Sequence, residues 1–232
     1  MNLFSFAKKA AVAALLASLL HSPALAEENS GSSWASLFDG KTLQGWTQKG
    51  GKAQYRVEDS QIIGKAVANT PNSFLCTERA YTNFVLELEF KVDDGLNSGV
   101  QIRSQCFDKE TSFEAKGKTH RVPAYRVHGL QVEIDPSARA WSGGIHEEGG
   151  RSWLNDLKEN EPARKAFKAN EWNTLRIQCE GDSIRTWLND VPAADLKDSR
   201  TPAGFIALQV HNVAKERAGL EVRFRNVKVK EL

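Results

Sequence analysis

The sequence predicts an all-β fold, an antiparallel β-sandwich with one short helical insertion. Short segments in which aliphatic and polar residues alternate recur at close spacing along the chain. Such period-two alternation is typical of strands that have one face in a core. Turn-forming pairs such as Asp-Gly and Asn-Asp separate these segments, and no long repeat is present. Together these observations favour a single sandwich over a helical or mixed fold.

The N-terminal 26 residues have the pattern of an export signal. Two lysines precede an apolar run over 10–20, and an Ala-Leu-Ala site follows at 24–26. The run is too short to cross a bilayer of about 30 Å, and the A-x-A ending fits signal-peptidase cleavage. We therefore expect a periplasmic or secreted protein that is cleaved after Ala26. A signal peptide over 1–26, a loose segment over 27–35 and one domain over 36–232 are predicted.

The charge of the mature chain argues against a polyanionic partner. The sequence has 31 Lys and Arg against 29 Asp and Glu, and Lys8 and Lys9 lie in the expected signal. Cleavage therefore leaves equal numbers of both signs. We expect no nucleic-acid partner and no membrane span after cleavage; the oligomeric state is not predicted.

Three cysteines lie within the mature chain. A bridge between Cys76 and Cys106 is compatible with an oxidising compartment, but an odd number leaves one thiol unpaired. Cys179 alternates in phase with Leu175 and Ile177, which predicts a small buried hydrophobic residue. No cysteine spacing matches a zinc site, and no cysteine is given a catalytic role.

The predicted elements follow one another with short connections. A hairpin spans 54–65, and Pro162 suits the first turn of a helix over 161–168. A helical turn is expected at 153–158, an irregular excursion over the sheet at 105–123, and a bulge near Arg225-Asn226. The remaining strands are expected over 74–77, 81–93, 99–104, 130–135, 172–179, 183–188, 205–210 and 220–229.

Three of these strands carry an unusual polar face. In the stretch from Tyr125 to Arg151, Leu130, Val132 and Ile134 alternate with Gln131, Glu133 and Asp135. Residues i and i+2 of a strand lie about 7 Å apart on one face, so the two carboxylates are expected to lie close together. Close carboxylates acquire unequal pKa values, bind a cation or grip sugar hydroxyls. An ordinary solvated face with basic partners is the alternative.

The other two strands repeat this pattern at distant positions. Gln101 and Arg103 alternate with aliphatic residues over 99–104, and Gln209 and His211 do so over 204–212. No lysine occupies these positions, whereas solvated faces are usually rich in lysine. We therefore predict that the three strands share one functional face. A glycine-rich loop that follows, over 141–151, adds further candidates for close contact with a ligand, which are Trp141, His146, Glu148 and Arg151.

These segments, in this order, resemble the family once called DUF1080 and now described as 3-keto-disaccharide hydrolase. The resemblance covers nearly the whole mature chain. The matching stretches are SLFDGKTLQGW at 36–46, LNSGVQIRS at 96–104, HGLQVEIDPSARAWSGGI at 128–145, EWNTLRIQCEGDSIRTWLND at 171–190, GFIALQVH at 204–211 and VRFRNVKVKEL at 222–232.

The resemblance implies a concanavalin A-like jelly-roll sandwich, often found in exported bacterial proteins. It also implies cleavage of 3-keto-glucosides, by direct hydrolysis or by 1,2-elimination followed by hydration of the 2-hydroxy-3-keto-glucal. Many members read Glu-Val-Gln where this chain has Gln131-Val132-Glu133, so the carboxylate lies two residues further along.

The candidate residues supply each group that such chemistry needs. A 3-keto group acidifies the hydrogen on C2, so a site needs a base, a positive group at the C3 oxygen and an acid for the leaving oxygen. Glu133 or His211 could be the base, Arg103 could hold the enolate, and Asp135 or Glu148 could be the acid. Candidates for substrate binding are Gln101, Gln131, Trp141, His146, Arg151 and Gln209.

Two alternatives remain at the level of the sequence. Glu133, Asp135 and His211 could supply a mixed oxygen and nitrogen site for a divalent cation, although no metal-spacing motif is present. A lectin-like carbohydrate-binding module without chemistry could use the same scaffold, because fold does not fix function. Such a module would depend on exposed Trp residues such as Trp141 rather than on convergent carboxylates.

Overall fold

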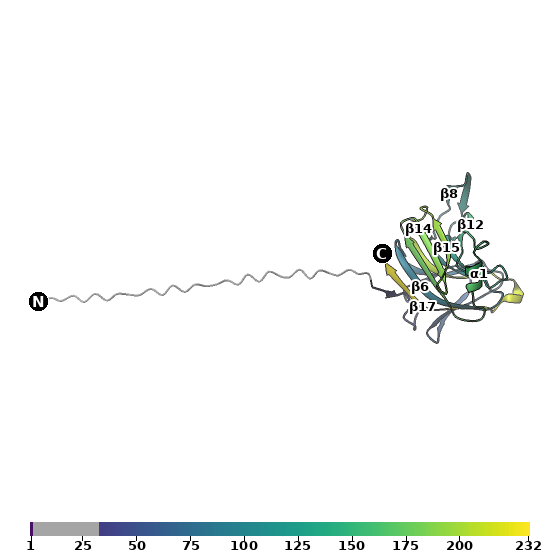
Figure 1. Cartoon of the computed structure of the whole chain (residues 1–232), viewed down its shortest axis with the longest axis horizontal. Coiled ribbons are helices and arrows are strands. Elements are labelled where there is room, and N and C mark those ends of the chain that lie inside the picture. Colours follow the sequence, from purple (N-terminus) through teal and green to yellow (C-terminus); the bar gives the residue numbers. More distant parts are fainter. Residues whose placement is uncertain (2–32) are drawn as a thin grey trace. The chain divides into compact units, whose positions relative to one another are not determined.

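A computed structural model describes Met1 and residues 33–232. Residues 33–232 form two packed antiparallel sheets (Figure 1). The predicted signal peptide and most of the loose segment lie outside the described residues. No helix among the described residues is long and apolar enough to cross a membrane. The antiparallel sandwich predicted from the sequence is confirmed.

The first sheet presents β6, β14, β15 and β17 side by side in Figure 1. In spatial order it contains β15 (Val191–Lys197), β14 (Ser183–Leu188), β13 (Asn173–Glu180), β6 (Phe84–Val92), β17 (Glu221–Glu231), β4 (Gln61–Lys65) and β3 (Gln54–Glu58), with β1 (Ala35–Ser36) paired to β17.

The second sheet carries the polar face described above. In spatial order it contains β12 (Ser152–Asn155), β11 (Ile145–Glu148), β10 (His128–Ile134), β7 (Ser98–Gln105), β16 (Gly204–Val210), β5 (Ser73–Tyr81) and β2 (Trp46–Gly50). The three polar strands are adjacent in this sheet, as predicted, because β7 pairs with β10 on one side and with β16 on the other.

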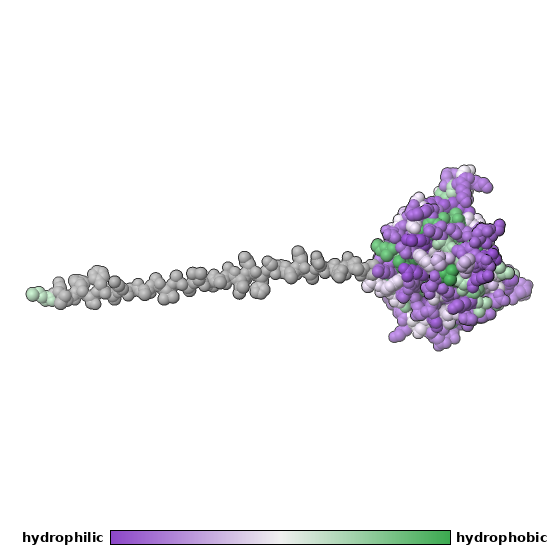
Figure 2. All heavy atoms as spheres, in the orientation of Figure 1, coloured by the Kyte–Doolittle hydropathy of each residue, from purple (hydrophilic) through white to green (hydrophobic). Residues whose placement is uncertain are grey.

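The core lies between the sheets and is built from the aliphatic halves of the alternating strands. Leu88 and Phe90 of β6 and Val132 and Ile134 of β10 are at most 1% exposed and belong to one cluster. Each such side chain contributes about 1.5–3 kcal/mol when it is fully buried. The visible surface of the domain is accordingly mostly hydrophilic, with scattered apolar residues (Figure 2).

Several local predictions are confirmed. The hairpin forms as β3 and β4, and Cys179 is fully buried in the core. The helix α1 (Glu161–Ala166) begins with Pro162 in its first turn, and the Asn160 side chain accepts a hydrogen bond from the amide of Ala163. The bulge also exists, because the pairing of β17 with β6 shifts register after Arg225.

The helical turn expected at 153–158 is wrong. Residues 152–155 form β12, in which Trp153 pairs with His146 and Ser152 with Glu147 of β11. Pairing across strands therefore overrides the local pattern here, as tertiary context commonly does. A short 3₁₀-helix, η1 (Lys215–Arg217), precedes the last strand.

The predicted excursion over 105–123 contains a hairpin, β8 (Thr111–Ala115) and β9 (Lys118–Val122), whose β8 strand stands away from the sandwich in Figure 1. Next to it, Val127 and Cys106 pack against Cys76 of β5 and Ala207 of β16. The excursion thus covers part of the outer face of the second sheet. Cys76 and Cys106 are free thiols in this structure, and burial raises the pKa of Cys76 to about 12.

Candidate functional site

A row of carboxamides crosses the outer face of the second sheet. Gln131 Oε1 accepts hydrogen bonds of 2.7 Å from both Gln101 Nε2 and Gln209 Nε2. Gln131 Nε2 in turn donates to Glu133 Oε2 at 2.8 Å. Because three strands contribute to this row, the sheet itself fixes where the Glu133 carboxylate lies. Gly99, opposite Glu133, leaves room for the row, since a Cβ there would lie 2.7 Å from Gln131.

Glu133 is the buried carboxylate of the site. It is 5% exposed, and its Oε1 accepts hydrogen bonds from Asn97 Nδ2 at 2.6 Å and from Arg139 Nη2 at 3.2 Å. Burial raises the pKa of Glu133, and the hydrogen bonds from Asn97 and Gln131 offset this only in part. Each carboxylate oxygen offers two lone pairs. Oε2 therefore keeps one lone pair with which it can take a proton.

Arg139 supplies the positive charge of the site. Its Nε lies 2.7 Å from Asp135 Oδ2, and its guanidinium carbon lies 4.8 Å and 4.9 Å from the ring centres of Trp141 and Trp153. The contacts with the two rings and with Asp135 hold the guanidinium beside Glu133. Cation–π contacts of this kind stabilise by about 0.5–2 kcal/mol each.

Asp135 anchors the loop that presents Arg139. Its carboxylate accepts hydrogen bonds from the amides of Ser137 and Trp141 as well as from Arg139. Burial alone would raise the pKa of Asp135, but these donors outweigh burial and lower it. Asp135 is therefore ionised at neutral pH and is unsuited to the acid role predicted for it. The two neighbouring carboxylates have pKa values shifted in opposite directions, as paired groups with different tasks often do.

These groups face a cavity of about 370 Å³. His146 and Glu148 enter it from β11, and His211 enters it from the residue after β16. Burial lowers the pKa of His146, so its imidazole is neutral at pH 7. The cavity is lined by Asn97, Gln131, Glu133, Asp135, Arg139, His146, Glu148, Trp153 and His211. The structure thus brings together Gln131, Glu133, Asp135, His146, Glu148 and His211 as predicted.

Arg103 does not reach this cavity, and its predicted place on the functional face is wrong. Its guanidinium is fully buried and donates to the carbonyl oxygens of Thr82 and Gly181, both at 2.7 Å, and to Asn83 Oδ1 at 3.2 Å. These partners lie in loops that join other strands. Arg103 therefore ties loops together and has no part in the site.

The reason is a break in the alternation of β7. Arg103 has a φ of +46°, and the pairing of β7 with β16 shifts register between Phe205 and Ala207. Ser104, rather than Arg103, joins the carboxamide row, since its hydroxyl donates to Gln101 Oε1 at 2.7 Å. A period-two pattern read through a bulge assigns the residues after it to the wrong face.

Arg151 also lies outside the cavity. It forms ion pairs with Glu147 at 2.7 Å and with Asp198 at 2.6 Å, and Arg200 pairs with the same Glu147. This buried network fastens the end of β11 to the loop after β15. Gln101 and Gln209 do not line the cavity either, and they act on it only through Gln131.

The sequence of this chain matches a known protein family. The sequence model of the 3-keto-alpha-glucoside-1,2-lyase-like domain matches residues 33–230. The chain belongs to this family. A 3-keto-disaccharide hydrolase from Bacteroides thetaiotaomicron (strain VPI-5482) is 24% identical over 240 residues, which cover 86% of this chain and 78% of that protein.

Solved structures show the same fold at low identity. A Bacillus subtilis protein of unknown function with a galectin-like fold superposes with a TM-score of 0.58 at 12% identity, over 82% of this chain and 90% of its own. The carbohydrate-binding module CBM66 from B. subtilis superposes with a TM-score of 0.52 at 19% identity, over 81% of this chain and 96% of its own. The jelly-roll sandwich implied for the 3-keto-alpha-glucoside-1,2-lyase-like domain is confirmed.

In this 3-keto-alpha-glucoside-1,2-lyase-like domain, three residues of the cavity were not predicted. Asn97 lies in the turn before β7, Arg139 in the loop after β10, and Trp153 on β12. Arg139 had a sequence signal, because it follows the carboxylates within four residues of Asp135. Asn97 and Trp153 reach the cavity only through the packing of separate strands.

The residues expected for a divalent cation do not form a recognisable ligand set. Among residues 33–232 no three His, Cys, Asp or Glu side chains gather as metal ligands do. The oxygens of Asp135 accept hydrogen bonds from Arg139 and from backbone amides, and a guanidinium beside them repels a cation. The arrangement is better suited to a polar ligand with hydroxyl groups.

Proposed function

We propose that this chain is an enzyme that cleaves 3-keto-glucosides, with Glu133 as the base that removes the hydrogen on C2. The observation that carries this proposal is the buried Glu133 carboxylate, which has a raised pKa, an unused lone pair and a cationic neighbour. A carboxylate that burial has made more basic accepts a proton more readily than an ordinary one. Family membership supports the same substrate class.

The proposed reaction begins with proton transfer from C2 to Glu133 Oε2. The electron pair of the C2–H bond forms an enolate with the C3 carbonyl, and Arg139 stabilises the negative oxygen. The enolate then expels the C1 substituent, so that a C1=C2 double bond forms and the C1–O bond breaks. A fixed cation in a partly buried cavity is worth more than the same charge in water.

The leaving oxygen must gain a proton, and His211 is the better suited of two groups lining the cavity to supply it. Glu148 accepts hydrogen bonds from Arg126 and Asn72, much as Asp135 does from Arg139, whereas His211 Nδ1 lies 2.8 Å from the carbonyl oxygen of Asn212. That contact requires a hydrogen on Nδ1, which leaves Nε2 as the group that exchanges protons in the cavity. Glu148→Gln and His211→Gln variants distinguish the two donors.

Direct hydrolysis would need a different arrangement. Two carboxylates would have to lie across the glycosidic bond, one as acid and one as nucleophile or base. Asp135 is unsuited to either role because hydrogen bonds from Arg139 and the loop amides occupy it. Elimination needs one base and one positive group, which Glu133 and Arg139 provide.

The test is turnover of defined sugars by the purified protein. Incubation with 3-keto-trehalose and 3-keto-sucrose should release the C1 substituent, while ordinary trehalose and sucrose should remain intact. If hydration follows, the 3-keto-glucose formed in D₂O should carry deuterium at C2. Parallel reactions with EDTA test the divalent cation. Equal activity on unoxidised trehalose would reject the 3-keto requirement.

A binding module without chemistry is the second candidate, and Trp153 favours it because it lines the cavity, whereas the predicted Trp141 does not. One face of Trp141 and one face of Trp153 are, however, occupied by Arg139 and are not available to stack on a sugar. Saturable binding of unoxidised sugars without turnover of any 3-keto-glucoside would support this candidate over the enzyme.

A further inference from the structure

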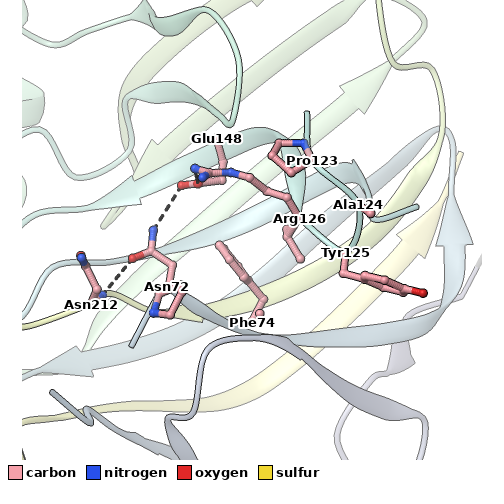
Figure 3. Close-up of a pocket in the computed structure, with 11 residues that line it drawn as sticks. Asn72, Phe74, Pro123, Ala124, Tyr125, Arg126, Glu148 and Asn212 are labelled. Atoms are coloured by element: carbon pink, nitrogen blue, oxygen red, sulfur yellow. Dashed lines mark hydrogen bonds and ion pairs between the residues drawn. The ribbon is translucent and has the colours of Figure 1, made fainter. Parts of the chain in front are cut away.

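A second cavity adjoins the first and has a different character. It has a volume of about 480 Å³, and it shares Glu148 with the cavity of the candidate site. Asn212, which lines it, directly follows His211 of the first cavity. Figure 3 shows Glu148, Asn72 and Asn212 linked by hydrogen bonds along one side of this cavity.

The base of the second cavity is apolar. Phe74 of β5 lies between the Asn72 side and the Tyr125 side in Figure 3, and it packs with Val127 in the small cluster on the outer face. Pro71 and Pro123 add further apolar surface. The first cavity, by contrast, is lined almost entirely by polar and charged groups. One cavity therefore suits a fully polar ring, and the other suits a ring with one apolar face.

Tyr125 is the most conspicuous residue of the second cavity. The residue is 70% exposed, and its backbone has a φ of +63°. An aromatic residue in this region of backbone space is strained by about 1–3 kcal/mol, and such strain is often found at functional sites. The amide of Tyr125 donates to the carbonyl of Phe107 at 2.7 Å, so that the backbone is held although the ring is exposed.

We propose that this second cavity binds the aglycone, the part of the 3-keto-glucoside that leaves from C1. The proposal rests on the proposed function, since it assumes that the 3-keto ring occupies the first cavity. The glycosidic oxygen would then lie beside Glu148, where the two cavities meet. The preferred aglycone is a ring with an apolar face, with Phe74 against the face, Asn72 at the edge and Tyr125 at the end of the cavity away from Glu148.

Two kinds of aglycone have such a face, a second hexose, which also carries hydroxyl groups, and an aromatic ring that is linked to C1 through a phenolic oxygen. Both present a flat or nearly flat face of carbon and hydrogen, which aromatic side chains bind. A methyl aglycone has no ring and would leave the cavity empty. Comparison of the three aglycones therefore isolates the contribution of the second cavity.

The experiment measures kcat/KM for methyl 3-keto-glucoside, phenyl 3-keto-glucoside and 3-keto-trehalose in wild type, Tyr125→Ala and Tyr125→Phe. We expect the ratio of kcat/KM for each ring substrate to kcat/KM for the methyl substrate to be about tenfold lower in Tyr125→Ala than in wild type. In Tyr125→Phe this ratio should be unchanged. Comparing ratios removes differences in leaving-group reactivity. Trp34→Ala is the matched control, because Trp34 is an exposed aromatic residue that contacts Lys228 of the first sheet.

Each outcome decides the proposal. A lower kcat/KM ratio for one ring substrate alone identifies the class of aglycone that the second cavity binds. Unchanged ratios for both ring substrates overturn the proposal that this cavity is an aglycone site. If the methyl substrate is turned over, the proposed function stands whatever the ratios show. If no substrate is turned over, titration calorimetry with phenyl glucoside and trehalose tests the cavity by itself, and equal affinity in wild type and Tyr125→Ala overturns it.

Discussion

Glu133 is a carboxylate in an environment that disfavours its charge. Burial removes it from water, and its neighbours Asn97, Gln131 and Arg139 compensate only in part, so its pKa remains raised. Both oxygens of Glu133 accept hydrogen bonds, Oε1 from Asn97 and Arg139 and Oε2 from Gln131. A buried carboxylate with a raised pKa, set beside a cation in a cavity, is the kind of group that transfers protons.

Replacing Glu133 with Gln should lower turnover of a 3-keto-disaccharide by at least about a hundredfold, because a general base contributes about 10²–10⁴-fold. The side chain keeps its shape, so the circular dichroism spectrum and the melting temperature should show an intact fold. Steady-state kinetics measure the effect. Full activity of the variant would remove Glu133 from the chemistry and leave His211 as the base to test.

The two arginines should respond differently to substitution. Arg139→Ala removes the cation of the site and should cost about a hundredfold in kcat, and the loss of its two cation–π contacts should lower the free energy of unfolding by about 1–4 kcal/mol. Arg103→Ala removes three hydrogen bonds and the packing of a fully buried side chain, and it should lower the free energy of unfolding by about 3 kcal/mol or more. Parallel kinetics and denaturant unfolding separate these effects. A stable, inactive Arg103→Ala protein would contradict the structural role assigned to Arg103.

At the scale of elements, β7, β10 and β16 act as one positioning device. The central strand is β7, and the Gln131 carboxamide of β10 accepts hydrogen bonds from Gln101 of β7 and from Gln209 of β16. Gln131 in turn donates to Glu133 and so fixes the position of its carboxylate. Gly99 on β7 makes the row feasible because it has no side chain. The precision of the site thus comes from strand pairing, which is more rigid than a loop.

Gly99→Ala tests this device without touching a polar group of the site. The added Cβ would lie 2.7 Å from Gln131 and should displace it from Glu133. Loss of a donor to the carboxylate raises its pKa further, so the acidic limb of the kcat/KM profile should move to higher pH. Stability should fall by about 1–3 kcal/mol from overpacking. A destabilised variant with an unmoved pH profile would show that the row does not tune Glu133.

At the scale of the whole molecule, the site has a measurable effect on folding. The pKa of Glu133 is raised above its ordinary value of 4.5 in the folded state, so the folded chain binds this proton more tightly than the unfolded chain. The stability that this group contributes is fully present below pH 4.5 and is lost as the pH rises through the folded pKa. The ionised Glu133 that the proposed reaction needs at neutral pH therefore lowers the free energy of unfolding.

The Glu133→Gln variant lacks this titration. Its melting temperature, measured relative to wild type, should accordingly increase as the pH is raised from about 4 to 8. Differential scanning calorimetry across this range measures the difference directly, and other titrating groups cancel in the comparison. A difference that stays constant with pH would contradict a raised pKa in the folded protein.

Local patterns in the sequence were enough to predict the fold class and most of the polar face. Alternation along β6, β10 and β16 is local information, because each strand shows its buried side in its own residues. The same alternation identified Gln131, Glu133 and Gln209. Family resemblance added the jelly roll, which the structure confirms, and the substrate class that we propose.

Only the tertiary structure decided which charged groups meet Glu133. Arg103 was assigned to the site because its strand alternates, but a bulge turns its guanidinium towards Thr82, Asn83 and Gly181. Arg139 takes the position beside Glu133 because Asp135 and two tryptophans from separate elements hold it there. A bulge changes the face of every residue after it, and loop contacts depend on residues far away in the chain. Neither follows from a local pattern, because both are set by the packing of the whole sheet.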